Sequence, residues 1–142
     1  MIGKEVIYMV KAGFIAGFVN LLFGLGINAV LGMILPGLEQ EYQNSSVFRS
    51  WQDPLMMIYV AYPFILGLVL AYLWRKLYKQ LKGTDPQKAM EFAKIYFVIA
   101  TIPGMFISYT SLQLSFLMIL VWTFTGFIQA YLAGLVYTKY LK

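Results

Sequence analysis

The feature that most constrains this chain is a run of 27 residues, Ala12–Leu38, that contains no charged side chain. A bilayer core of ~30 Å is crossed by about 20 apolar helical residues, so this run is long enough to span a membrane. Small or polar residues recur along it every three or four positions and therefore share one face of a helix. This row, which we call the seam, comprises Gly13, Gly17, Asn20, Gly24, Asn28 and Gly32. The run predicts a transmembrane helix with one narrow packing face.

The composition extends this prediction to the whole chain. Of its 142 residues, 61% are hydrophobic and only 12% are charged, whereas soluble domains have about 25% charged residues. No polar segment is long enough to fold by itself, so we expect a single transmembrane domain over residues 1–142. The chain has no Cys and no His, which removes the commonest nucleophiles, bases and metal ligands. We therefore expect no metal site, no cofactor and no enzymatic activity.

Two further uncharged runs give the number of helices. They cover Pro54–Trp74 and Ile95–Thr138, and the second has 44 residues. At ~1.5 Å per residue it would be about 66 Å long as one helix, so it must fold back, and Ser108–Gln113 is its most polar stretch. The sequence predicts an all-α polytopic membrane protein whose four transmembrane helices form an antiparallel bundle. The expected helices cover about residues 6–35, 54–81, 86–108 and 112–138.

Residues typical of helix ends support these bounds. Pro36 and Gly37 are expected to end the first helix, and Asp53 is expected to cap the second, with Pro54 in its first turn. Thr84 and Gln87 have the spacing of a capping box at the start of the third. Inside the spans, Pro63 and Pro103 are expected to interrupt the second and third helices.

The distribution of charge predicts the orientation. With both termini cytoplasmic, ten of the eleven Lys and Arg residues lie inside and Arg49 alone lies outside, as the positive-inside rule requires. The net charge of +5 then reflects topology and contact with anionic headgroups, not nucleic-acid binding. We expect a multi-pass protein of a prokaryotic cytoplasmic membrane, with Trp51 and Trp74 at the two interfaces. The outer acids Glu39, Glu41 and Asp53 are expected to be solvated.

Small residues also mark the fourth helix, where Gly126, Ala130 and Gly134 follow one another at intervals of four. Such rows let helix backbones approach closely in lipid. Within this protein they predict a compact bundle, and they also fit docking of a second copy or of another membrane protein.

Polar groups at membrane depth allow two interpretations. They either form hydrogen bonds between helices or line a pathway for a small solute, because an unpartnered amide in hydrocarbon is costly. Trp122 is expected near the bilayer centre, where it either faces lipid or lines a cavity with Asn28, Tyr59 and Tyr62. The candidate pathway residues are Asn20, Asn28, Tyr59, Tyr62, Trp122 and Gln129.

Three functions are compatible with these features. The first is a non-enzymatic subunit or accessory of a membrane assembly that acts through helix packing. The second is a small carrier or channel component for a neutral or weakly polar solute, although no charged residue lies at mid-membrane depth, where proton relays and ion-coupled carriers place one. The third is an interfacial enzyme that acts on lipids.

Overall fold

The computed structural model describes residues 3–142, and within that range it contains helices and no strands. The first span is α1 (Lys4–Ile34), and a short helix, α2 (Pro36–Tyr42), follows it. The second span is made of α3 (Pro54–Met57), the 3₁₀ turn η1 (Ile58–Ala61), α4 (Tyr62–Leu77) and the 3₁₀ turn η2 (Tyr78–Gln80). The third consists of α5 (Asp85–Tyr96), the π-helical turn η3 (Phe97–Thr101) and α6 (Ile102–Ser111), and the fourth is α7 (Phe116–Tyr140).

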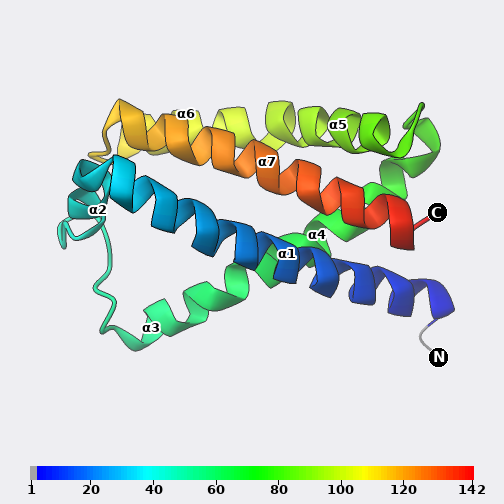
Figure 1. The fold of residues 1–142 in the computed structure, drawn as a ribbon, viewed down its shortest axis with the longest axis horizontal. Coiled ribbons are helices and arrows are strands. Elements are labelled where there is room, and N and C mark those ends of the chain that lie inside the picture. The colour runs from blue at the N-terminus through cyan, green and yellow to red at the C-terminus, as the bar shows by residue number, and fades with distance from the viewer. Residues whose placement is uncertain (1–2) are drawn as a thin grey trace.

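The predicted set of four spans is confirmed. Four helical segments are long and apolar enough to cross a membrane: Lys4–Ile34, Pro54–Gln80, Asp85–Ser111 and Phe116–Tyr140. Consecutive spans run in opposite directions, and the described N-terminal end and the C-terminus lie at the same end of the bundle (Figure 1). We call this the inner end, following the charge-based orientation, and the opposite end the outer end.

Two predicted caps are confirmed. The Asp53 side chain accepts a hydrogen bond from the backbone N–H of Leu55 at 2.9 Å, and Pro54 occupies the first turn of α3. At α5, the backbone N–H of Thr84 donates to Gln87 Oε1 at 2.9 Å as part of a capping box. The local sequence thus defines where the second and third spans begin.

The end of the first span is confirmed, whereas the last turn differs from the prediction. α1 stops at Ile34, just before Pro36 and Gly37, and Pro36 then begins α2, because proline is well tolerated in the first turn of a helix. The last turn between spans lies later than expected: α6 continues to Ser111, and α7 begins at Phe116 after Ser115, whose hydroxyl caps the Met118 N–H at 3.1 Å.

Both intramembrane prolines lie beside irregular turns, as predicted. Pro63 follows the 3₁₀ turn η1 at the start of α4, and Pro103 follows the π-helical turn η3 at the start of α6. Proline cannot donate the backbone hydrogen bond that a regular α-helix requires, so the helix geometry changes at these positions.

The helices pack in a defined order. α4 crosses α1 near its middle, α7 lies against α1, and α5 lies on the other side of α7 (Figure 1). Beyond the crossing, η1 and α3 diverge from the outer half of α1. The bundle is therefore closed at its inner end and open between α1 and α3 at its outer end.

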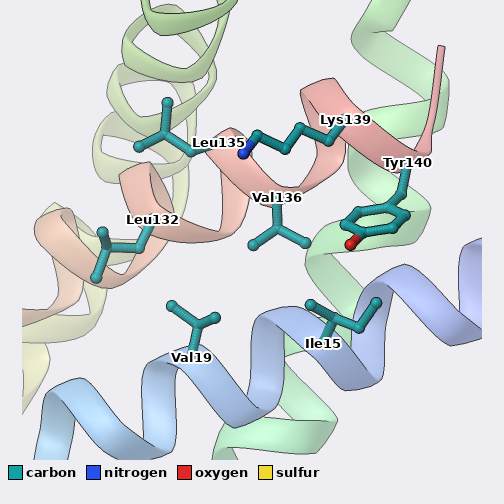
Figure 2. Close-up of a pocket in the computed structure, with 7 residues that line it drawn as sticks. All are labelled: Ile15, Val19, Leu132, Leu135, Val136, Lys139 and Tyr140. Atoms are coloured by element: carbon teal, nitrogen blue, oxygen red, sulfur yellow. The ribbon is translucent and has the colours of Figure 1, made fainter.

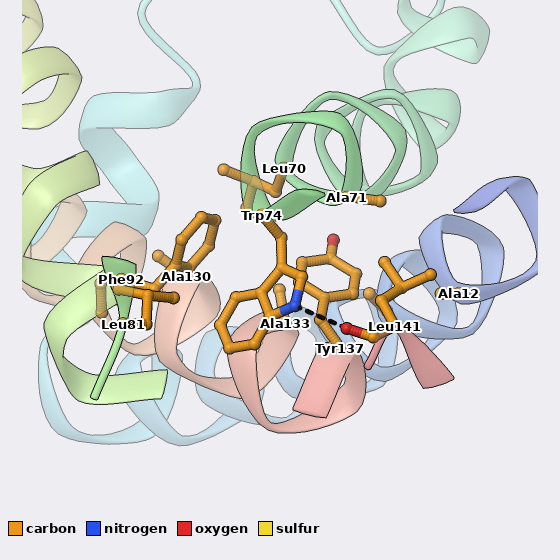
Figure 3. Packing of buried hydrophobic residues seen from close by; sticks show 12 residues of the cluster. Ala12, Leu70, Ala71, Trp74, Leu81, Phe92, Ala130, Ala133, Tyr137 and Leu141 are labelled. Carbon is orange, nitrogen blue, oxygen red and sulfur yellow. Dashed lines mark hydrogen bonds between the residues drawn. The ribbon is translucent and has the colours of Figure 1, made fainter. Parts of the chain in front are cut away.

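An aromatic cluster holds the inner end together (Figure 3). Trp74, Phe92 and Tyr137 are fully buried, and the Trp74 ring lies 5.1 Å from that of Phe92 and 5.8 Å from that of Tyr137. The indole N–H of Trp74 donates to the Leu141 carbonyl at 3.2 Å. Trp74 therefore lies near the inner end of the bundle, but its side chain points into the bundle and is not part of an exposed aromatic belt at the interface. Trp51 is 64% exposed in the outer segment.

A second cluster attaches α2 to the outer end of α7. Its buried residues are Leu38, Leu114, Met118 and Ile119. The Trp122 indole N–H donates to the Tyr42 hydroxyl, and the Trp122 ring lies 6.2 Å from that of Phe48.

Candidate functional site

The inner half of the seam is the closest helix contact of the bundle. A Cβ atom built on Gly13 would lie 2.9 Å from Leu68 Cα, and one on Gly17 would lie 2.7 Å from Phe64 Cα. Contacts under 3.0 Å with backbone atoms leave no room for any side chain. The partner of these glycines is α4, the second span.

Gly67 completes this contact from the side of α4, and the sequence analysis did not single it out. A Cβ on Gly67 would overlap the Gly13 carbonyl oxygen and would lie 2.8 Å from the Gly17 nitrogen. The Gly67 carbonyl also accepts a hydrogen bond from the Tyr137 hydroxyl at 2.6 Å, which ties α7 to the same point. The signal was present in the sequence, since Gly67 and Ala71 are spaced as a small-xxx-small pair.

Asn20 marks the middle of the seam. Its side chain is fully buried, and neither its amide nitrogen nor its amide oxygen has a hydrogen-bond partner among residues 3–142. Leaving such a group unpaired costs about 1–3 kcal/mol. Asn20 therefore neither joins two helices by a hydrogen bond nor faces an open pathway in this structure.

The outer half of the seam is left uncovered. A Cβ on Gly24 would meet no neighbouring atom of the described chain within 4 Å, and Asn28 is exposed. Gly32 is approached by Glu39 Oε2, at 3.7 Å from such a Cβ. Since α3 and η1 diverge from α1 here, no other helix within residues 3–142 packs on Gly24, although α4 covers the inner half of the same face.

The small residues of α7 serve a different neighbour. Gly134 packs on α5, where a Cβ would lie 3.0 Å from Ala89 Cα, and Ala130 is fully buried in the inner cluster. Gly126, one turn further out, has nothing within 4 Å of its Cβ position in the part of the chain described. This row therefore follows the pattern of the seam, tightly packed at its inner end and open at its outer end.

The structure does not bring the candidate pathway residues to one place. Tyr59 and Tyr62 stack on each other with ring centroids 6.2 Å apart, and both are about half exposed. Trp122 instead contacts Tyr42 and Phe48 near the outer end of the bundle. Trp122 lies six residues after the start of α7, closer to the outer end of its helix than the expected ten, because α7 begins at Phe116 and not at about residue 112. Gln129 is half-buried on α7, and Asn28 lies on the open half of the seam.

The outer acids are not a simple solvated loop. Both carboxylate oxygens of Glu41 bind the start of α7: Oε1 accepts from the Ser115 N–H at 2.6 Å and Oε2 from the Ser115 hydroxyl at 2.7 Å. A carboxylate is favourable there because unpaired N–H groups give the first turn of a helix a partial positive charge. Glu41 is thus partly exposed and at the same time anchors α2 to α7.

Two outer groups have shifted acidities. The Arg49 guanidinium, 2.8 Å from the Asp53 carboxylate, and the Leu55 N–H lower the pKa of Asp53. Burial raises the pKa of Tyr42. Both groups hold the outer segment in place, and no group of three or more acidic, His or Cys side chains in residues 3–142 is arranged to hold a metal ion.

Together these features define the chain as a multi-pass integral membrane protein with four helical spans. Comparison with protein-family models, curated proteins and solved structures finds no match.

Proposed function

We propose that the protein is a non-enzymatic subunit or accessory of a larger membrane assembly, and that it binds its partner through the outer half of the seam. The observation that carries this proposal is the contrast between the two halves of one helix face. Gly13 and Gly17 are covered by α4, whereas Gly24 and Asn28 continue the same row with no helix against them. The seam has the small residues needed for close helix packing along its whole length, but α4 packs on only its inner half.

The energetics of Asn28 support the same conclusion. Taking Ala12 as the start of the hydrocarbon core, Asn28 lies ~24 Å along the helix, inside a core of about 30 Å. An amide exposed to hydrocarbon costs several kcal/mol unless it finds a partner. A second helix docked on Gly24 and Asn28 would supply one, and helix-to-helix hydrogen bonds of this kind contribute ~0.6 kcal/mol on average.

The partner is either a second copy of this chain or another membrane protein with a polar group at the same depth. A side-chain amide both donates and accepts, so two Asn28 side chains related by a two-fold axis would satisfy each other. We place the assembly in the cytoplasmic membrane of a prokaryote, with both termini inside, because of the strong excess of basic residues at that end. The carrier alternative has less support, since its candidate residues do not converge.

The test compares variants of exposed positions that leave the bundle intact. Gly24→Leu and Asn28→Leu should reduce assembly, measured as the mass of the purified complex by light scattering and as partner retained from native membranes. Val30→Leu, at a position 49% exposed on the same helix, is the matched control and should assemble normally. None of the three variants should unfold at a lower temperature than the wild type.

Two outcomes would contradict the proposal. Equal assembly of the wild type, Gly24→Leu and Asn28→Leu would show that the outer seam binds no partner. Loss of solute uptake in proteoliposomes by a stable, normally assembled Asn28→Leu Gln129→Leu protein would instead favour the carrier.

A further inference from the structure

A groove runs along the surface between α1 and α7, on the inner half of the bundle (Figure 2). Its volume is about 310 Å³, and apolar side chains line most of it, including Ile15 and Val19 from α1 and Leu132 and Val136 from α7. Small-molecule pockets span roughly 300–1,000 Å³, so a groove of this size holds one narrow apolar group and not a whole lipid.

Two polar side chains border this groove. They are Lys139 and Tyr140, from the last turn of α7. In Figure 2 the Lys139 side chain runs back along α7 toward Leu135, and the Tyr140 hydroxyl points toward the space between Val136 and Ile15. Side chains on a helix lean toward its N-terminus, which for α7 is the direction of the membrane interior.

The Lys139 ammonium has no anionic partner within the protein as described. The three ion pairs found in residues 3–142 join Arg49 to Asp53, Arg75 to Glu5 and Lys94 to Glu91, and the groove lining contains no carboxylate. A lysine near a helix end ordinarily extends its ammonium into water. Lys139 and Tyr140 are both exposed, and they border an apolar channel in a membrane leaflet that is rich in anionic lipids.

We propose that this groove binds one acyl chain of an anionic phospholipid, and that Lys139 and Tyr140 bind its phosphate. The ligand must carry a chain for the apolar channel and a negative charge at the end of that chain. A zwitterionic lipid also has a phosphate, but its own ammonium or choline group offsets the charge that Lys139 would bind. The site therefore selects for net negative charge. It does not depend on the helix partner proposed above.

Native mass spectrometry of the full-length protein tests this site directly. The protein in mild detergent is exposed to equal amounts of phosphatidylglycerol and phosphatidylcholine with identical acyl chains. We expect one phosphatidylglycerol to be retained in preference to phosphatidylcholine. Lys139→Gln should weaken this binding about fivefold, the effect of one basic residue near a charged surface. Lys79→Gln, at an exposed residue outside the groove, is the charge-matched control and should bind like the wild type.

A second pair of variants tests the acyl channel. Val19→Trp and Leu132→Trp fill it from opposite sides, and each should reduce retention of phosphatidylglycerol. Leu22→Trp adds the same side chain at a position 54% exposed on α1, outside the groove, and should not. Thermal unfolding of each variant shows which ones remain folded. One folded groove variant, either Val19→Trp or Leu132→Trp, is enough to test whether a chain enters the groove.

Four results would overturn the proposal. Equal retention of the two lipids would show ordinary annular lipid, and equal losses in Lys139→Gln and Lys79→Gln would show non-specific attraction. Full binding by folded Val19→Trp or Leu132→Trp would show that no chain enters the groove. Displacement of the lipid by soluble glycerol phosphate at comparable concentration would make the ligand a free phosphate.

Discussion

The close approach at Gly67 makes a quantitative prediction about stability. In Gly67→Ala, the new methyl group would overlap the Gly13 carbonyl oxygen and lie 2.8 Å from the Gly17 nitrogen. Both obstacles are backbone atoms, so no side chain can rotate away. To reach the ~3.5 Å of ordinary contact from the nitrogen alone, α1 and α4 must separate by roughly 0.7 Å.

This separation has an estimable cost. Overpacking of this kind destabilises proteins by about 1–3 kcal/mol. Moving α4 also stretches the hydrogen bond from the Tyr137 hydroxyl to the Gly67 carbonyl. Hydrogen bonds between membrane helices contribute ~0.6 kcal/mol on average. Alanine also has a higher helix propensity than glycine, which offsets up to ~1 kcal/mol of this cost, so we expect Gly67→Ala to lower the free energy of unfolding by about 1–3 kcal/mol.

Gly24→Ala is the matched control. The substitution is identical, but a Cβ at Gly24 meets no neighbour within 4 Å in the described chain. Replacing a helical glycine by alanine without a clash stabilises by up to ~1 kcal/mol, so the two variants should shift stability in opposite directions.

The assay is reversible unfolding in mixed micelles, in which increasing sodium dodecyl sulfate is followed by tryptophan fluorescence. The buried Trp74 reports on the inner cluster next to the crossing. Equal unfolding of Gly67→Ala and Gly24→Ala would refute the reasoning, since it would mean that the backbones do not meet at Gly67.

Two further predictions concern the outer end and the orientation. Glu41→Ala removes both hydrogen bonds to Ser115 and should loosen α2 from α7 and make Trp122 more exposed. A red shift of Trp122 fluorescence in a Trp51→Phe Trp74→Phe background would reveal this. Glu39→Ala removes no bond to Ser115 and should have no effect, and equal spectra for the two variants would contradict the role of Glu41. The chain has no cysteine, so Ser45→Cys and Thr84→Cys each introduce a single site for labelling in intact cells. The basic residues predict that position 45 lies outside, so an impermeant reagent should label position 45 and not position 84. Labelling of position 84 alone would show the opposite topology.

Much of the fold could be predicted because its signals are local. Long uncharged runs locate the spans, and Asp53, Thr84 and Gln87 are capping residues whose bonds form within four positions along the chain. The error at the start of α7 is also local, because a polar stretch such as 108–113 can continue a helix by one more turn.

The partners of each helix face could not be predicted from the same signals. The seam identifies a packing face on α1 but not the helix that covers it, which depends on Gly67, far along the chain. Trp74 has the sequence position of an interfacial tryptophan, and only its contacts with Phe92, Tyr137 and Leu141 turn it inward. Glu41 likewise depends on Ser115, 74 positions away.

The crossing of α1 and α4 also has a mechanical consequence. The backbones touch at Gly13, Gly17 and Gly67. The part of the second span from Gly67 out to Pro54 extends ~20 Å from this contact point. A rotation of about 10° at the contact would move Pro54 by roughly 3 Å, because displacement grows with the length of the arm. A small rotation at the contact of the three glycines thus produces a much larger change in the width of the opening between α1 and α3. A molecule bound in that opening would in turn fix the crossing angle of α1 and α4.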